Sequence, residues 1–281
     1  AYLNAKMPED DIAYMKLDKQ TSEMLLKCDT SGELRAATQE SDDGQCTVKL
    51  EKALYGCVQS ARLWYNHLSG FLQRIGFAPN PVDPCVFNRM SSTGKQCTLA
   101  MHVDDGLATC VDVEELKKLD QEIRKEFNNE VESEIDCETF DYVGIKVDTK
   151  DGTEAELTMQ AYIKEVCEEF GVKNFATTPA ADNLFKVTEE QPKLTKEGKD
   201  RFHRSVAQLL YLATRVRPDA LLPVTFLCSR ASEPTTEDLT KLERAFRCLN
   251  GTSHLGILLG KRGQETSLTV YADASYAAHE N

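Results

Sequence analysis

The stretch CTLAMHVDDGLATCV, residues 97–111, sets two adjacent carboxylates, Asp104 and Asp105, between two apolar runs. An Asp-Gly pair between apolar runs is a strong signal for a β-hairpin, so we expect two antiparallel strands that reverse at Asp105–Gly106. A simple turn accounts for Asp105. It does not explain Asp104, because an apolar side chain beside Val103 would cost less free energy than a carboxylate. Keeping two neighbouring carboxylates ionised next to apolar strands is costly unless a cation offsets their charge. The stretch therefore predicts either a plain turn or a hairpin that holds magnesium.

The residues after this hairpin predict further strands and helices. Asp112 and Glu115 form a capping-box pattern at the start of a helix. Residues 142–159 read YVGIKV, DTKDGTE and AELTM and predict a second hairpin, and residues 160–170 predict a helix. The order strand, strand, helix, strand, strand, helix over residues 97–170 indicates an α+β fold, in which helices cover one face of an antiparallel sheet.

The N-terminal part contains one irregular segment and one clear helix. Residues 20–46 are polar and include DTSGE and QESDDGQC, so we expect a loop or a disordered insertion there. After a break at Gly56, apolar residues recur at helical spacing from Ala61 to Ile75. Gly76 is suited to end that helix as a C-terminal cap.

The character of the chain changes after residue 171. Residues 172–195 contain proline, threonine and aspartate and predict a linker. Three helices are expected between residues 196 and 250, because apolar residues recur there at helical spacing. The segments ILLG (257–260) and SLTVYADAS (267–275) predict strands.

The composition argues against several classes of protein. With 281 residues, 41% of them hydrophobic, the chain can form one large domain or two to three smaller ones. No apolar run reaches the roughly 20 residues of a membrane helix, and no export signal opens the chain. The ten cysteines are widely spaced and the five histidines show no HxxxH pattern, so a zinc site has little support. Free thiols in a reducing compartment are expected.

The charge is distributed unevenly along the chain. The formal net charge of -13 argues against a nucleic acid partner. However, residues 112–170 hold 19 acidic and 7 basic side chains, whereas residues 196–262 hold 12 basic and 7 acidic ones. The acidity therefore belongs to one segment, and a basic face is available in another, although a local excess of this size is also typical of an ordinary solvated surface.

Several segments, taken in chain order, resemble one known family. The segments are AYLNAKMPEDDIAYMKL (1–17), LEKALYGCVQSARLWYNHL (50–68), GFAPNPVDPCVF (76–87), MHVDDGLA (101–108), YVGIKV (142–147), LTMQAYIKEVCEEFGV (157–172), SVAQLLYLATRVRPDAL (205–221), CLNGTSHLGILL (248–259) and YADAS (271–275). They are similar to the reverse transcriptase region of copia-type long-terminal-repeat retrotransposon polyproteins, and their common order makes the resemblance specific.

The resemblance implies a right-hand polymerase fold. We expect an antiparallel palm sheet with helices on one face, a helical thumb or connection, and a truncated start of a ribonuclease H-like domain. The implied boundaries are fingers and palm at 1–171 (truncated at the N-terminus), a linker at 172–195, the thumb or connection at 196–262, and ribonuclease H at 263–281.

The resemblance also implies an active site at the first hairpin. Asp104 and Asp105 are the catalytic, metal-binding pair, and the expected cofactor is Mg²⁺, with Mn²⁺ as an alternative. His102 stands where the family usually has an aromatic residue that packs near the primer end, which would lower activity. The family's remaining polymerase aspartate would fall a few residues before Ala1, so the 281 residues alone are expected to show little polymerase activity.

Five further residues are expected near the incoming nucleotide. Gly56 would let the backbone approach the base pair, or it would simply precede a helix. Arg62 would touch phosphate, or it is an ordinary surface arginine. The nucleotide-binding set implied by the resemblance is Tyr55, Gly56, Gln59, Ser60 and Arg62.

Three more positions complete the implied sites. Tyr142 and Gly144 would contact the primer end, with a plain strand as the alternative. Asp273 matches the first metal-binding carboxylate of ribonuclease H, with an ordinary strand-end aspartate as the alternative. The helices between residues 196 and 250 would grip the duplex through its phosphates.

The function implied is an RNA-directed DNA polymerase that is part of a retrotransposon polyprotein. Its partners would be a primed RNA or DNA template, deoxynucleoside triphosphates and the protease, integrase and capsid parts, with no membrane. The implied location is the cytoplasm, inside a virus-like particle, with the nucleus as an alternative. Two other readings stay open: a non-catalytic remnant that keeps the fold and binds nucleic acid, and an acidic interaction domain unrelated to nucleic acid.

Overall fold

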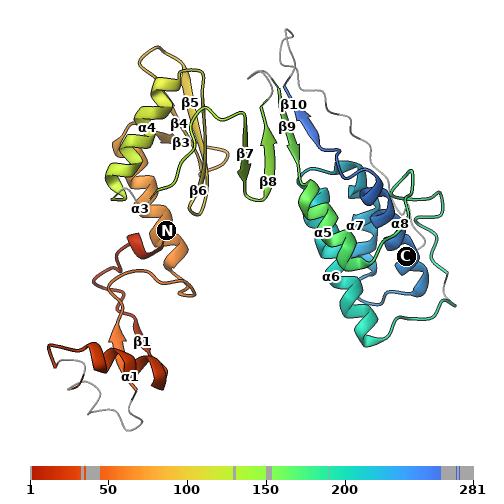
Figure 1. Cartoon of the computed structure of the whole chain (residues 1–281), viewed down its shortest axis with the longest axis horizontal. Coiled ribbons are helices and arrows are strands. Elements are labelled where there is room, and N and C mark those ends of the chain that lie inside the picture. The colour runs from red at the N-terminus through yellow and green to blue at the C-terminus, as the bar shows by residue number, and fades with distance from the viewer. Residues whose placement is uncertain are drawn as a thin grey trace. The chain divides into compact units, whose positions relative to one another are not determined.

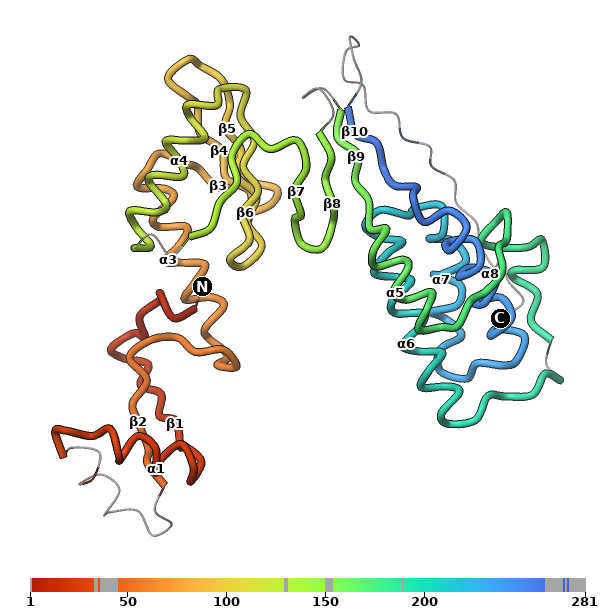
Figure 2. Tube along the Cα trace, viewed as in Figure 1, coloured from red at the N-terminus to blue at the C-terminus, as the bar shows by residue number. Residues whose placement is uncertain are grey.

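The computed structural model shows two compact units, which divide between Ile135 and Asp136 (Figures 1 and 2). The structure describes residues 2–32, 35, 45–128, 131–149, 154–188, 190–260, 270 and 272. Both units combine helices and strands, which confirms the expected mixed fold. Within the described residues, no helix is both long and apolar enough to span a bilayer.

The first unit is built on a four-stranded antiparallel sheet. The strands follow the order β3 (Ala78–Pro79), β4 (Val86–Met90), β5 (Gln96–His102) and β6 (Asp105–Cys110). Helices α3 (Ser60–Arg74) and α4 (Val113–Glu126) cover one face of this sheet (Figure 1). The core between them is apolar and includes Trp64, Leu68, Phe71, Leu72, Phe77, Phe87, Cys97, Leu99, Leu119 and Phe127.

Helix α3 confirms the expected helix and its end. Gly76 has a φ of 93° and donates its backbone N–H to the carbonyl of Gln73, as a C-terminal cap does. Helix α4 begins as expected at Asp112, whose side chain accepts from the N–H of Glu114. The predicted capping box is wrong, because Asp112 caps the helix through the N–H of Glu114, and Glu115 turns inward and binds Arg89 on β4.

The N-terminal part of the first unit corrects the expectation for residues 20–46. Helix α1 (Lys19–Cys28) lies in this segment and is capped by Asp18, whose side chain accepts from the N–H of Thr21. The helix was missed because it is mostly polar and lacks an apolar stripe, whereas the Asp18 cap supplies its start. Strands β1 (Tyr14–Lys16) and β2 (Thr47–Lys49) pair beside it.

The second unit contains another four-stranded antiparallel sheet. Its order is β10 (Ile257–Leu259), β9 (Ala155–Thr158), β8 (Ile145–Asp148) and β7 (Thr139–Tyr142). The strands expected over residues 97–170 therefore belong to two sheets, where the sequence predicted one. The reason is that β9 pairs with β10, a strand about 100 residues later, and local sequence carries no signal for such a partner.

The segment YVGIKV covers the end of β7, a turn and most of β8, so it forms a hairpin as its resemblance to the family's primer-grip hairpin implies, whereas its pattern alone was interpreted as one strand of a hairpin with AELTM. Val143 and Gly144 have φ values of 51° and 76°, and two positive values are typical of a type I′ hairpin turn. The expected pairing of β8 with β9 is confirmed, with Val147 opposite Leu157.

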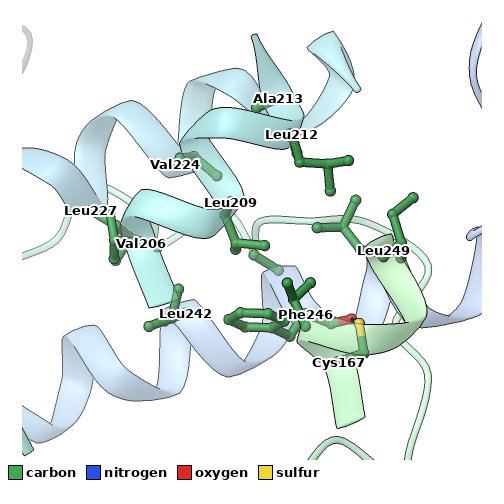
Figure 3. Close-up of a cluster of buried hydrophobic side chains, with 14 of the residues drawn as sticks. Cys167, Val206, Leu209, Leu212, Ala213, Val224, Leu227, Leu242, Phe246 and Leu249 are labelled. Carbon is green, nitrogen blue, oxygen red and sulfur yellow. Dashed lines mark hydrogen bonds between the residues drawn. The ribbon is translucent and has the colours of Figure 1, made fainter. Parts of the chain in front are cut away.

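Four helices enclose the core of the second unit (Figure 3). They are α5 (Gln160–Phe170), α6 (Lys196–Ala213), α7 (Leu221–Arg230), preceded by the short 3-10 helix η3 (Pro218–Ala220), and α8 (Thr236–Gly251). The three helices expected after residue 196 are thus confirmed. Helix α5, which the resemblance assigns to the palm, shares this core through Cys167, whose thiol lies 3.7 Å from the carbonyl of Phe246.

Two expected domain segments look different in detail. Residues 172–195 form no helix or strand where they are described, yet Leu184 is buried and Phe185 and Leu194 pack against the helical core. The strand predicted at 267–275 and the ribonuclease H start at 263–281, including Asp273, lie outside the described residues except for 270 and 272. The assignment of polymerase domains to these boundaries stays a prediction.

Candidate functional site

The hairpin expected at the paired aspartates is confirmed, but its turn lies two residues earlier than predicted. His102 ends β5 and pairs with Asp105, which begins β6, so Val103 and Asp104 make the reversal. Gly106 lies within β6, opposite Met101. A Cβ at Gly106 would come within 2.9 Å of the Met101 Sδ, so glycine leaves room for a side chain on the neighbouring strand.

The turn has an unusual backbone conformation at Val103. Its φ is 60°, whereas β-branched residues very rarely adopt the left-handed region. A positive φ at the first central residue is what a type II′ turn requires, and glycine is the usual residue there. The turn that carries Asp104 therefore holds a conformation that its own sequence disfavours.

Asp104 and Asp105 are both exposed at this turn. Asp105 shares a face of the sheet with its cross-strand partner His102, and this is the face opposite the helices, because Leu99 and Cys97 of the alternate positions are buried in the core. Adjacent exposed carboxylates supply the oxygen donors that Mg²⁺ and Mn²⁺ prefer. Among the described residues no three or more histidine, cysteine or acidic side chains gather closely enough to hold a metal, so the pair would be a partial set of ligands.

Helix α3 reaches the turn through one side chain. The indole Nε1 of Trp64 donates a hydrogen bond to the backbone carbonyl of Val103. Trp64 is itself held among aromatic rings, with its ring centroid 5.6 Å from that of Phe127 and 6.1 Å from that of His67. The structure thus joins the expected nucleotide-pocket segment to the hairpin.

The expected nucleotide-binding residues lie just before and at the start of α3. Tyr55 is exposed, and its ring lies 4.6 Å from that of Tyr2. Gly56 has a φ of 98°, and a Cβ there would meet nothing within 4 Å. Gly56 therefore allows a left-handed turn, and no other part of the described chain lies close to it. Gln59 precedes the helix, and its Nε2 donates to Asp11 Oδ2 at 3.3 Å.

Ser60 and Arg62 differ in accessibility. The Ser60 side chain is buried, and its hydroxyl donates a 2.6 Å hydrogen bond to the carbonyl of Leu54. It therefore supports the turn before α3 from inside the protein. Arg62 is exposed on the helix. A direct contact with a nucleotide is thus easier to make for Arg62 than for Ser60.

The expected primer-contact residues Tyr142 and Gly144 belong to the second unit, at the β7–β8 turn. A Cβ at Gly144 would lie 3.5 Å from the hydroxyl of Tyr211 on α6. The guanidinium of Arg215 lies 3.8 Å above the Tyr211 ring, and Tyr162 meets that ring edge-on at 5.4 Å. Burial raises the pKa of Tyr162. The turn therefore lies beside an aromatic cluster that carries a cation.

Burial makes the Cys97 thiol, which lies in the β5–β6 hairpin, unreactive at neutral pH. Cys97 on β5 lies directly opposite Cys110 on β6. Burial raises the pKa of Cys97 to about 11, so the thiol stays protonated at neutral pH. All ten cysteines of the chain are free thiols.

Sequence reasoning missed three features of the site: the support from Trp64, the role of Met101 beside Gly106, and the cluster of Tyr211 and Arg215. Trp64 had one usable signal, since it is the single tryptophan of the chain and lies in the helix next to the nucleotide-pocket segment. Its helical spacing was read only as core packing. The other two depend on contacts between separate elements and carry no local signal.

Comparison with known proteins gives a consistent result. The sequence profile of the family "Reverse transcriptase (RNA-dependent DNA polymerase)" matches residues 32–181. A transposon Ty5-1 protein of Saccharomyces cerevisiae is 27% identical over 82% of this chain and 73% of its own length. The Pol polyprotein of transposon RE1 from Arabidopsis thaliana is 30% identical over 86% of the chain, and that of transposon TNT 1-94 from Nicotiana tabacum is 27% identical over 82%. No solved structure matches the chain.

The chain spans different shares of these relatives. It covers most of the Ty5-1 protein but only 16% of the RE1 polyprotein and 17% of the TNT 1-94 polyprotein. The similarity therefore concerns one region of the long polyproteins.

Proposed function

The chain belongs to the reverse transcriptase (RNA-dependent DNA polymerase) family, and from this premise we propose that its β5–β6 hairpin is the metal-binding centre of an RNA-directed DNA polymerase. The observation that carries the proposal is the position of Asp104 and Asp105. They stand exposed at the turn of a hairpin whose other face is packed in an apolar core. A rigid base of this kind keeps catalytic carboxylates in a constant geometry.

Asp104 and Asp105 would hold divalent ions through their carboxylate oxygens. When bound, such ions supply the positive charge that offsets the negative charge developing on the attacking and leaving oxygens of nucleotidyl transfer. The chain's own contribution is to present both carboxylates at one exposed turn. His102, cross-strand from Asp105, would lie near the primer end.

The remaining residues would place the substrates. Tyr55, Gly56, Gln59 and Arg62 would lie along the incoming deoxynucleoside triphosphate, with Ser60 supporting their backbone from inside. Tyr142 and Gly144 would contact the primer, and the basic helices of the second unit would hold the duplex by its phosphates. Asp273 would begin a ribonuclease H site, although it lies outside the described residues.

The wider setting follows from the relatives. Two of them are Pol polyproteins of retrovirus-related transposons, so the chain would act with protease, integrase and capsid parts on a primed RNA or DNA template. Such proteins would work inside a virus-like particle in the cytoplasm, with the nucleus as an alternative.

The single tryptophan allows a direct test of the metal site. Because Trp64 binds the residue next to Asp104, a paramagnetic ion held by the pair should quench its fluorescence. We expect Mn²⁺ to quench the wild-type chain with saturation and the double variant Asp104→Asn/Asp105→Asn only by collision. The matched control is Asp10→Asn/Asp11→Asn, which neutralises another exposed adjacent pair. Saturable quenching that survives in the Asp104→Asn/Asp105→Asn variant would overturn the proposal.

A second experiment concerns activity. His102 stands where the family usually has an aromatic residue near the primer end, so we expect the 281-residue chain to bind a primed template but to extend it weakly. Primer extension with Mg²⁺ and deoxynucleotides measures this. Robust extension by the 281-residue chain would contradict the expectation of low activity, while leaving the role of the hairpin intact.

A further inference from the structure

The backbone conformation of Val103 needs stabilising contacts from other parts of the fold. Its φ of 60° suits glycine, and a valine that adopts it needs surroundings that over-determine the conformation. Relaxation of this residue would change the direction of the backbone into Asp104. The positions of the Asp104 and Asp105 carboxylates therefore depend on the contacts that stabilise Val103.

Among the described residues, Trp64 supplies a side-chain hydrogen bond to the backbone of this turn. Its indole N–H donates to the Val103 carbonyl, and the side chain is only 6% exposed. A donor buried in this way cannot easily exchange its partner for water, so loss of the bond leaves a polar group unsatisfied. This hydrogen bond therefore stabilises the turn more than the same hydrogen bond would on an open surface.

The donor is also held firmly in place. The Phe127 ring, just after α4, packs against both Trp64 and Phe71 of α3, with centroids 5.6 Å and 5.7 Å apart. Phe127 therefore holds the indole and is itself held by Phe71, and the indole holds the turn. Residues that orient the ligands without touching the ion keep the geometry of a metal site constant.

We propose that Trp64 is a positioning residue of the metal-binding hairpin: its indole N–H holds the left-handed turn at Val103 and so keeps Asp104 and Asp105 in the arrangement that binds divalent ions. This inference rests on the proposed function of the hairpin. Trp64 touches neither substrate nor ion and acts only through the Val103 carbonyl.

The test is a double-mutant cycle between residues 64 and 103 in the 281-residue chain. Trp64→Phe keeps an aromatic ring and removes the N–H. Val103→Gly makes the left-handed turn intrinsically favourable. The readout is amide hydrogen exchange of residues 101–107, compared with β4 of the same sheet, so that local opening is separated from unfolding of the whole unit.

We expect Trp64→Phe to speed exchange of residues 101–107 by about fivefold relative to β4, as loss of one hydrogen bond would. Adding Val103→Gly should restore most of the protection, because glycine no longer needs the support. The control is Leu68→Ala, which damages the same core on the same helix. In Leu68→Ala, amide exchange should rise in β4 and in the hairpin together. Adding Val103→Gly should not restore the protection.

Mn²⁺ affinity, measured by electron paramagnetic resonance of the free ion, should fall in Trp64→Phe and recover in Trp64→Phe/Val103→Gly. The proposal is overturned if Trp64→Phe leaves the hairpin as protected as in wild type, or if Val103→Gly rescues Trp64→Phe and Leu68→Ala equally. If the exchange pattern is as expected but wild type binds no Mn²⁺, the support of the turn stands and the proposed metal site fails. If Mn²⁺ binds equally to wild type and Trp64→Phe, the metal site stands and the positioning role fails.

Discussion

Arg89 on β4 donates a 2.7 Å hydrogen bond to Glu115 on α4, and both side chains are almost excluded from solvent. The same guanidinium also donates to Glu122 and to the carbonyl of Ile75, both at 2.8 Å. One buried cation thus joins the sheet to the helix that follows the hairpin and to the end of α3. The ion pair fixes α4 on the sheet at the end of the β5–β6 hairpin that lies away from its turn, because Arg89 pairs with Cys97.

We predict that Arg89→Met lowers the free energy of unfolding of the first unit by about 3–5 kcal/mol, because Glu115 would be left buried without its cation. The double variant Arg89→Met/Glu115→Leu should recover most of this loss, since it removes the unpaired charge as well. Urea unfolding followed by Trp64 fluorescence reports on this unit alone. A double variant no more stable than Arg89→Met would contradict the explanation.

Gly256 permits a close contact between two strands of the second unit. A Cβ at this position would lie 2.0 Å from the carbonyl oxygen of Leu157 on β9, which is backbone and cannot move aside. We predict that Gly256→Ala costs about 1–3 kcal/mol and exposes β9 and β10 to faster amide exchange. Gly70→Ala is the control: it lies inside α3 in open space and should stabilise its unit by about 0.5–1 kcal/mol. Unchanged exchange of β9 in Gly256→Ala would count against the contact.

Asp219 should make the second unit sensitive to acid. Its hydrogen bonds to the buried guanidinium of Arg217 hold the pKa of this carboxyl below its usual value. The stabilisation is therefore complete above the unfolded pKa of about 4 and is lost as the pH falls through the lower, folded value. The difference in unfolding free energy between wild type and Asp219→Asn should be largest near neutral pH and should shrink below about pH 4.

Circular dichroism during urea unfolding at a series of pH values measures this difference. Asp200→Asn, an exposed substitution on α6, is the control. A constant gap between wild type and Asp219→Asn from pH 7 to pH 3 would show that the ion pair does not act through this titration.

Arg215 should contribute to duplex binding if the second unit grips phosphates. Its guanidinium lies over Tyr211, beside the β7–β8 turn. We predict that Arg215→Gln weakens binding to a primed template and reduces the salt dependence by about one phosphate contact. Fluorescence anisotropy at several salt concentrations measures both. Arg74→Gln, which breaks an exposed pair with Glu126 in the first unit, should change neither, and equal effects would remove the special role of Arg215.

The β5–β6 hairpin shows how much of the fold local sequence can predict. Apolar runs around Asp-Gly predicted two paired strands correctly, because strand periodicity and turn residues act over a few neighbours. The position of the turn was wrong, since Gly106 serves the Met101 side chain across the ladder and Val103 takes the left-handed position. Strand register depends on the partner strand, and no feature near Gly106 reveals that partner.

The ends of the helices also include features that local sequence predicts and features that tertiary contacts decide. Gly76 caps its helix as expected, and Gly171 ends α5 in the same way, because a left-handed C-terminal residue is a local requirement. Glu115 was expected to complete a capping box, but it binds Arg89 of another element. A buried ion pair outweighed a local cap, and only the folded chain could decide between them.

The amino-acid sequence by itself determined the helices and strands around the paired aspartates, the exposed carboxylates as candidate metal ligands, and the family. These follow from periodicity, turn chemistry and segment order, all of which act along the chain. Only the tertiary structure decided that Trp64 binds Val103, that Ser60 is buried, and that β9 pairs with β10. Such contacts join residues far apart in sequence, so their free energy is set by packing in three dimensions and leaves no local pattern.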